Sequence, residues 1–157
     1  MNYTFQQITQ KQAETIAYTW HYDGEYAFYD MEADEEDLAE FVDPEARGDL
    51  VYSVLDGNRL IGFFSFARTN DHTLDIGLGM SPDLTGKGAG LEFVQAGLEF
   101  AKESLNPQKI TLAVAAFNKR AIKVYERAGF EITSTFSQAT NGSTYEFVKM
   151  EYQDEKE

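Results

Sequence analysis

The chain has 157 residues, of which 43% are hydrophobic and 14% aromatic, and its formal net charge is −14. This size and composition predict one globular domain, which we assign to residues 1–152, with a charged tail at residues 153–157. Cysteine is absent, which excludes disulfides, thiolate metal ligands and a cysteine nucleophile, and we expect no metal site.

The negative charge is concentrated in residues 25–49, where eleven acidic residues and one base contribute −10 of the −14. We expect no nucleic-acid partner, because phosphates need a basic surface. The acidic segment favours a cationic substrate, although such charge also serves solubility alone. The sequence shows no long apolar run and no leader-like first segment, so we expect no membrane partner and a cytoplasmic protein.

Hydrophobic periodicity and turn residues predict eleven elements in the order β-α-α-β-β-β-α-β-α-β-β. Thr9 can cap the first helix, because Gln12 follows three residues later as in a capping box. Gly57 and the pair Asn141-Gly142 lie in predicted hairpin turns. The predicted fold is a mixed α/β sheet, mostly antiparallel, with flanking helices. The predicted strands are 3–8, 50–55, 60–66, 74–80, 109–115, 130–136 and 144–150, and the predicted helices are 10–20, 35–41, 91–105 and 118–128.

A glycine-rich loop separates a predicted strand from a long amphipathic helix. Glycines at such a junction let backbone N–H groups wrap an anion, and the helix adds the positive end of its dipole. The pattern is not a Walker loop, because Gly88 follows the lysine where that motif has Ser or Thr. It is not a dinucleotide fingerprint either, because Leu91 occupies the position of the third glycine. A phosphate cradle is predicted, and a tight turn that packs the helix is the alternative. The loop consists of Thr85, Gly86, Lys87, Gly88, Ala89 and Gly90.

A second pattern, N-x-x-A-x-x-x-Y-x-x-x-G-F, follows on the last predicted helix. Asn118, Ala121 and Tyr125 share one face of that helix, and Gly129 and Phe130 follow it. A tyrosine phenol, whose ordinary pKa is about 10, keeps its proton at neutral pH and can act as a general acid. The alternative for Tyr125 is a half-buried tyrosine of the core.

These two patterns together resemble the signature of the GCN5-related N-acetyltransferase (GNAT) family over residues 50–150, near its ribosomal-protein-alanine acetyltransferase-like branch. The resemblance implies transfer of an acetyl group from acetyl-coenzyme A to a primary amine by direct attack. It also implies a sheet whose central strands splay apart. Thr85 departs from the family, which usually has Gln or Arg there, and this affects the side-chain bracing of the loop rather than its amides.

The resemblance assigns roles around the cofactor. Residues 85–90 bind its pyrophosphate, Asn118 contacts the pantetheine arm, and Tyr125 is the general acid. The backbone N–H groups of Leu78 and Met80 bind the acetyl and pantetheine carbonyls.

The basic residues of the last predicted helix have two interpretations. Lys119, Arg120 and Lys123 offset the repulsion between an acidic chain and an anionic cofactor, and we place Lys123 among the cofactor-binding residues. A solvated helix face is the alternative for all three.

The general base is less well defined. Members of the family that acetylate protein N-termini often carry Glu at the position of Ala113, which cannot act as a base. Asp75 stands where other members carry Glu on the preceding strand, and it is our candidate base, directly or through water. A solvent-facing strand aspartate is the alternative, and an amine that arrives neutral needs no base.

An aromatic cluster, Trp20, Tyr22, Tyr26 and Tyr29, lies beside the acidic segment, in the region that walls the acceptor site in the family. Aromatic rings with carboxylates suit an ammonium group. The alternative is that these rings pack into the core. His21 is a second candidate base.

Three functions remain open from the sequence. The first is an amine acetyltransferase acting on a small amine or a peptide N-terminus. The second is a non-catalytic coenzyme A sensor, and the third is a nucleotide-binding module of another class. The resemblance also allows a homodimer through the strand at residues 144–150.

Overall fold

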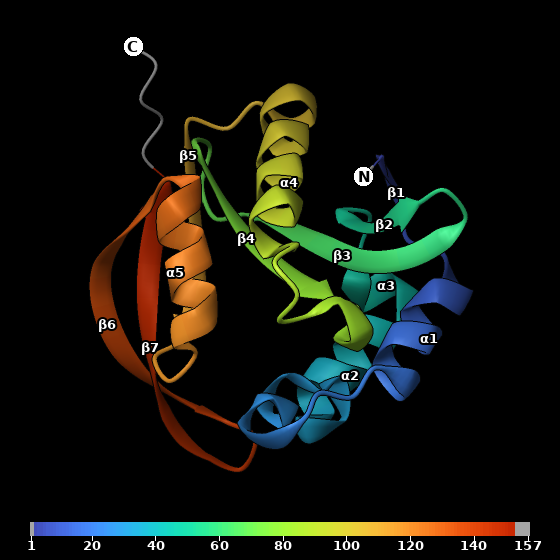
Figure 1. Ribbon diagram of the computed structural model, residues 1–157, viewed down its shortest axis with the longest axis horizontal. Helices are drawn as coiled ribbons and strands as arrows, with labels where there is room; N and C mark the ends of the chain where they lie inside the picture. Colours follow the sequence, from blue (N-terminus) through green and yellow to red (C-terminus); the bar gives the residue numbers. More distant parts are fainter. Residues whose placement is uncertain (1, 153–157) are drawn as a thin grey trace. The chain divides into compact units, whose positions relative to one another are not determined.

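The computed structural model describes residues 2–152, and its elements follow the predicted order (Figure 1). Seven strands form a sheet in the order β1-β2-β3-β4-β5-β7-β6, in which β1–β2, β2–β3 and β5–β7 are antiparallel and β4–β5 is parallel. The predicted mixed α/β fold is therefore confirmed. The strands are β1 (Tyr3–Gln7), β2 (Val51–Asp56), β3 (Arg59–Arg68), β4 (Thr73–Met80), β5 (Lys109–Ala115), β6 (Phe130–Thr140) and β7 (Ser143–Tyr152).

Contacts divide the chain into two compact units, which are described separately. Of the described residues, the first unit contains 2–65, 78–84 and 139–143, and the second contains 66–77, 85–138 and 144–152. The prediction of one domain over residues 1–152 stays a prediction, and the predicted tail lies outside the described residues.

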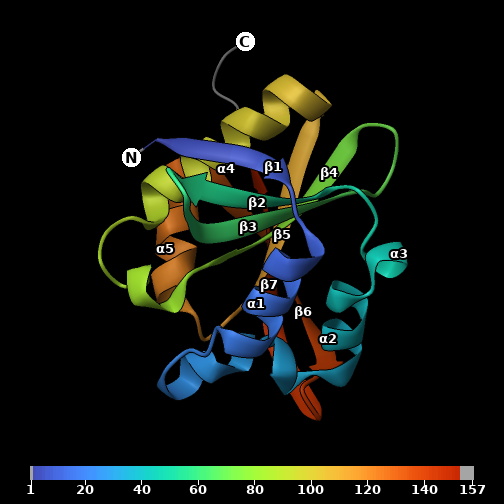
Figure 2. The same ribbon diagram turned by 90° about the vertical axis from the view of Figure 1, so that its right-hand side faces the viewer.

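In the first unit, α1 (Gln10–Thr19) packs its apolar face into the core. Thr9 and Gln12 form the predicted capping box, with the Thr9 hydroxyl accepting from the Gln12 backbone N–H at 3.0 Å. The helix lies beside α2 (Glu35–Val42), as Figure 2 shows. The buried core residues here are Ala13, Ile16, Ala17, Trp20, Phe41, Val51 and Phe63.

In the second unit, α4 (Gly90–Leu105) and α5 (Lys119–Ala128) lie side by side (Figure 1). The helix α4 buries Phe93, Val94, Leu98 and Ala101, which recur at helical spacing. Asn118 caps the start of α5, and Gly129 ends it in a left-handed conformation with φ of 115°. A glycine adopts this conformation without the steric cost of a Cβ.

The strands β4 and β5 pair over only part of their length. The parallel register joins Thr73 to Lys109, Leu74 to Ile110 and Asp75 to Thr111. Both strands continue past the last pair, β4 to Met80 and β5 to Ala115. The early end of this ladder agrees with the splayed central strands of the predicted fold.

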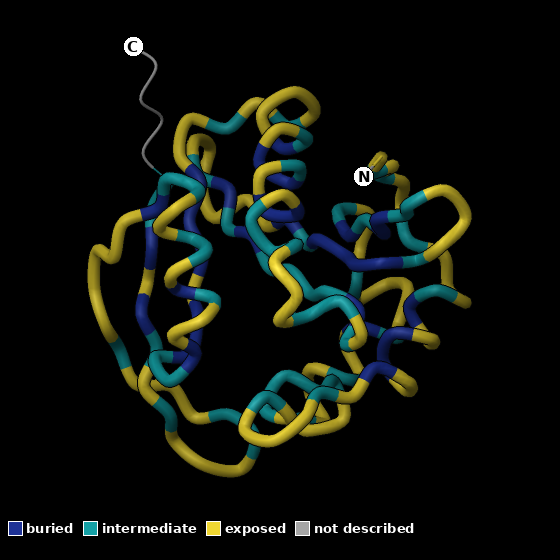
Figure 3. Tube along the Cα trace, viewed as in Figure 1, coloured by how far each residue is buried: buried dark blue, intermediate teal, exposed yellow. Residues whose placement is uncertain are grey.

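The last hairpin is longer than predicted, since β6 extends from Phe130 to Thr140. Its turn residues Asn141 and Gly142 have φ of 50° and 79°, the left-handed values of a tight hairpin turn. β7 lies between β5 and β6, so its two edges are both paired and β6 is the edge strand. Most of β6 is exposed (Figure 3), so a homodimer through the backbone of β7 would require its ladder to open.

The structure adds short helical turns that periodicity did not indicate. Each has three to six residues, too few for an apolar repeat. They are the 3₁₀ turns Gly24–Tyr29, Met31–Ala33 and Pro82–Leu84 and the short helix α3 (Pro44–Arg47).

Candidate active site

The glycine-rich loop has the geometry of an anion cradle. Gly86 and Gly88 have φ of 74° and 86°, conformations that L side chains rarely adopt. A Cβ at Gly88 would meet no atom within 4 Å, so its side-chain position is open space. α4 begins at Gly90 without a side-chain cap. An anion can therefore satisfy the N–H groups of this helix start.

The turn just before the loop is braced by side chains of the first unit. The Ser81 hydroxyl donates to one carboxylate oxygen of Asp83, and the Arg59 guanidinium donates to the other. The hydrogen bond from the Ser81 hydroxyl, and to a smaller extent the charge of Arg59, hold the pKa of Asp83 below its ordinary value. Neither Ser81 nor Arg59 was singled out from the sequence, although the Ser-x-Asp spacing is a local signal for such a turn.

The second predicted motif lies on α5 as expected. Asn118 is buried, and its side-chain oxygen accepts from the Ala121 backbone N–H at 3.1 Å. Asn118 therefore fixes where α5 begins, and its contact with pantetheine stays a prediction. Tyr125 is half-buried, with its ring edge-on to Phe130 at a centroid distance of 6.0 Å. Lys123 is exposed.

Asp75 lies where the β4–β5 ladder ends. Its carboxylate accepts a hydrogen bond of 2.7 Å from the hydroxyl of Thr111, which is 2% exposed. Asp75 itself is half-buried. Ala113, by contrast, is exposed on β5 and pairs with Lys149.

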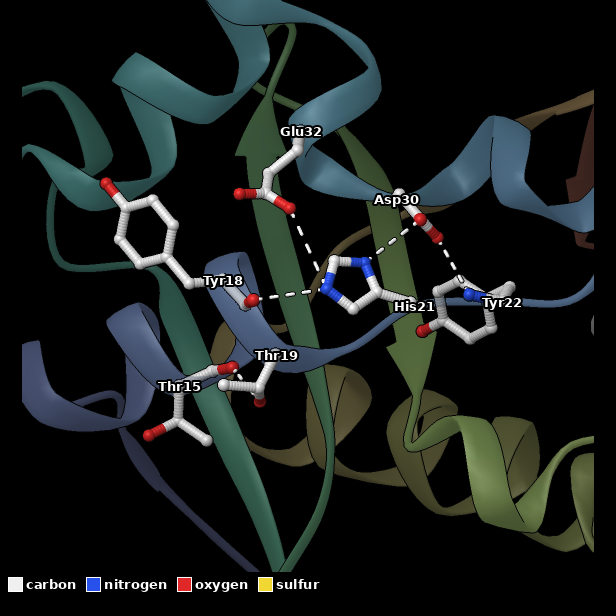
Figure 4. A network of polar contacts seen from close by, with 7 residues as sticks. All are labelled: Thr15, Tyr18, Thr19, His21, Tyr22, Asp30 and Glu32. Carbon is white, nitrogen blue, oxygen red and sulfur yellow. Dashed lines mark hydrogen bonds and ion pairs between the residues drawn. The ribbon is translucent and has the colours of Figure 1, made fainter.

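In the first unit, the predicted aromatic segment is tied to the end of β4. The Tyr22 hydroxyl donates to the Met80 carbonyl at 2.7 Å. The Tyr22 backbone N–H donates to the Asp30 carboxylate at 2.8 Å, as Figure 4 shows. Burial, and secondarily the Asp30 charge, raise the pKa of the Tyr22 phenol, so it remains a donor. Sequence reasoning missed Asp30, because in an acidic run it resembles a solvated charge.

His21 completes this network. Its Nδ1 lies 3.1 Å from the Asp30 carboxylate, while its Nε2 lies 3.2 Å from the Tyr18 carbonyl and 3.7 Å from the Glu32 carboxylate (Figure 4). Both nitrogens face acceptors, which favours the doubly protonated ring. The Asp30 hydrogen bond accordingly raises the pKa of His21. His21 as a second candidate base stays a prediction.

The His21 network predicts a pH-dependent stability. Because the folded-state pKa is raised above about 6.5, its stabilisation is complete below that pH and is lost as pH rises through the raised value. The difference in melting temperature between wild type and His21→Gln should therefore be larger at acidic than at alkaline pH. His72→Gln, at an exposed turn residue, is the control. A difference for His21→Gln that stays constant across this range would contradict the protonated network.

The other predicted aromatic residues divide into two groups. Trp20 is 9% exposed and packs in the core of the first unit, which accounts for its side chain without an acceptor role. Tyr26 and Tyr29 are half-buried on the 3₁₀ turn Gly24–Tyr29.

Gly79 on β4 is needed for packing, because a Cβ there would lie 2.4 Å from Cε1 of Phe63. Leu78 beside it is half-buried.

Comparison with known proteins identifies the family of this chain. A family model described as an acetyltransferase (GNAT) domain matches residues 2–131. The chain therefore belongs to the GNAT acetyltransferase family, as its two motifs predicted. A mycothiol acetyltransferase from Propionibacterium freudenreichii subsp. shermanii is 43% identical over 58 residues, which is 37% of this chain. The matched part covers only 18% of that curated relative.

Solved structures share the fold. A spermidine N-acetyltransferase from Vibrio cholerae, in complex with CoA and spermine, has a TM-score of 0.73 at 20% identity, covering 95% of this chain and 94% of that one. The ribosomal-protein-S5-alanine acetyltransferase from Vibrio fischeri has a TM-score of 0.65 at 21% identity, covering 98% and 94%. At this identity the likeness establishes the fold alone.

The structure also bears on membrane spans and metal sites. In the part of the chain that the structure describes, no helix is both long and apolar enough to cross a membrane. Among residues 2–152, no three His, Asp or Glu side chains gather closely enough to hold a metal ion.

Proposed function

We propose that this protein is an N-acetyltransferase that moves an acetyl group from acetyl-coenzyme A to a primary amine. The observation that carries the proposal is a loop in which Gly86 and Gly88 are left-handed and which leads into the start of α4, where no side chain caps the helix. The amides of such a loop fit a diphosphate. When bound, acetyl-coenzyme A supplies the acetyl group as a thioester, and the Leu78 and Met80 amides are proposed to bind its carbonyl oxygens.

Tyr125 is the proposed general acid. Its position on α5, seven residues after the capping Asn118, places both residues on one helix face. The phenol donates its proton to the departing thiolate, so that the thiol rather than the anion leaves. The packing of its ring on Phe130 supports this role by limiting the orientations of the side chain.

Asp75 is the proposed base for the amine. The Thr111 hydroxyl bond orients its carboxylate at the end of the β4–β5 ladder. If Asp75 takes the proton, Asp75→Asn should abolish the ascending limb in the dependence of kcat/KM on pH. Asp71→Asn at an exposed turn is the control. Identical profiles for all variants would show that Asp75 is a structural strand residue.

The proposed acceptor is a small cationic amine. Residues 25–49 carry −10 of the chain's charge, and a polyamine suits such a surface by Coulomb attraction. One protein of the same fold is a spermidine N-acetyltransferase, which supports testing polyamines first. Tyr22, Tyr26 and Tyr29 are the proposed aromatic contacts. A cytoplasmic location remains our expectation.

The test is release of free coenzyme A from acetyl-coenzyme A in the presence of amines. Spermidine, spermine and a short peptide with an N-terminal alanine should be compared at equal concentration, with acetylated spermidine blocked at its primary amines as control. Release with a polyamine supports the proposal, and release with the peptide alone moves the acceptor to a protein N-terminus. Cofactor binding without release for any amine would favour the coenzyme A sensor.

A further inference from the structure

Basic residues gather at the start of α5 in an otherwise acidic chain. Lys119 and Arg120 are the first two residues of the helix, Lys123 follows one turn later, and the first turn contains no acidic residue. Cations are unfavourable there, because the N-terminus of a helix is the positive end of its dipole. Residues that oppose a local preference of the helix in this way are expected at functional sites. These bases therefore match a negatively charged ligand.

Arg120 extends from this helix start to the glycine loop. A Cβ at Gly86 would lie 3.1 Å from Nη1 of Arg120 and 4.0 Å from its Cζ, so the guanidinium lies directly over that glycine. Two contacts within the second unit fix the position of the helix α5 that carries Arg120. Asn118 caps α5 two residues before Arg120, and a Cβ at Gly90 would contact Val124 of α5 at 3.6 Å.

The loop itself lacks the side chain that the family usually supplies. Thr85 stands at the position where Gln or Arg is usual, and a threonine hydroxyl carries no charge. We propose that Arg120 of α5, which lies over Gly86, binds the diphosphate of acetyl-coenzyme A at this loop. This inference rests on the proposed function. A planar guanidinium suits the site better than an ammonium, since it binds two phosphate oxygens in parallel.

The test measures binding rather than activity. Calorimetric titration with acetyl-coenzyme A should compare wild type with Arg120→Gln, Arg120→Lys and a single-charge control in the last turn of α5, Arg127→Gln. Arg120→Gln should raise Kd by about 10- to 100-fold, the range of one charge-assisted contact. Arg120→Lys should recover part of the loss. The control should change Kd by less than about threefold, because Arg127 lies in the last turn of α5 and a charge without a direct phosphate contact acts only through screened long-range attraction.

A second arm identifies the phosphate. The loss for Arg120→Gln should be the same with coenzyme A and with 3′-dephospho-coenzyme A, which keeps the diphosphate but lacks the ribose phosphate. A loss that disappears with the dephospho form would overturn the assignment to the diphosphate. Equal Kd values for wild type and Arg120→Gln would overturn the inference while leaving the proposed function intact. Absence of wild-type binding would overturn both.

Discussion

Replacing Tyr125 with phenylalanine should lower kcat by roughly 100-fold or more, while the Kd for acetyl-coenzyme A changes little. Phenylalanine keeps the ring that packs on Phe130 and removes only the hydroxyl, so the fold of α5 should be retained. Without the phenolic proton, the thiolate must leave as an anion, which raises the barrier of the chemical step. The measurement is steady-state kinetics at saturating cofactor, together with calorimetric binding.

Tyr18→Phe is the matched control, because Tyr18 is 47% exposed and its substitution removes the same atom from the surface. It should leave kcat unchanged. A Tyr125→Phe variant with wild-type kcat would show that Tyr125 is an ordinary half-buried tyrosine. A large rise in Kd instead would mean that the hydroxyl serves binding rather than proton transfer.

Replacing Gly88 with valine should weaken acetyl-coenzyme A binding by about 100-fold or more. The new side chain would occupy space that is open in this structure, where no atom lies within 4 Å of the Cβ position. It would keep the phosphate from the loop amides, and two lost charge-assisted hydrogen bonds of about 1.5 kcal/mol each account for this factor.

Gly57→Val separates this effect from backbone strain. Gly57 has φ of 63° and equally open space around its Cβ position, but it lies in the β2–β3 hairpin turn. Both variants should lose stability, since valine is strained at positive φ. Only Gly88→Val should lose cofactor affinity. Undiminished affinity in Gly88→Val would remove the loop from the cofactor site.

Much of the fold could be predicted because its signals are local. The Thr9–Gln12 capping box and the Asn141–Gly142 turn each depend on a few neighbouring residues, and the structure contains both. β5 was predicted at its observed bounds, Lys109–Ala115, because a short apolar run between turn residues has few alternatives. The boundaries of β6 were less clear, since an exposed strand has no apolar alternation to mark its end.

The candidate site was only partly predictable, because several of its contacts join residues far apart in sequence. The Tyr22 hydroxyl bond to Met80 spans 58 residues, and no spacing rule reports it. Trp20 was predicted at the acceptor because it belongs to an aromatic cluster beside the acidic segment, and the structure shows that it packs in the core of the first unit. Asp30 could not be distinguished from its acidic neighbours until its contacts with His21 and Tyr22 were known.

Titration of the purified protein with acetyl-coenzyme A, beside ATP and NAD, tests the proposed cofactor site most directly. The expected result is heat of binding and a higher melting temperature with acetyl-coenzyme A alone, because a ligand of the native state stabilises it by mass action. Stabilisation by ATP or NAD instead, with no response to acetyl-coenzyme A, would contradict the assignment of the glycine loop and the acetyl transfer built on it.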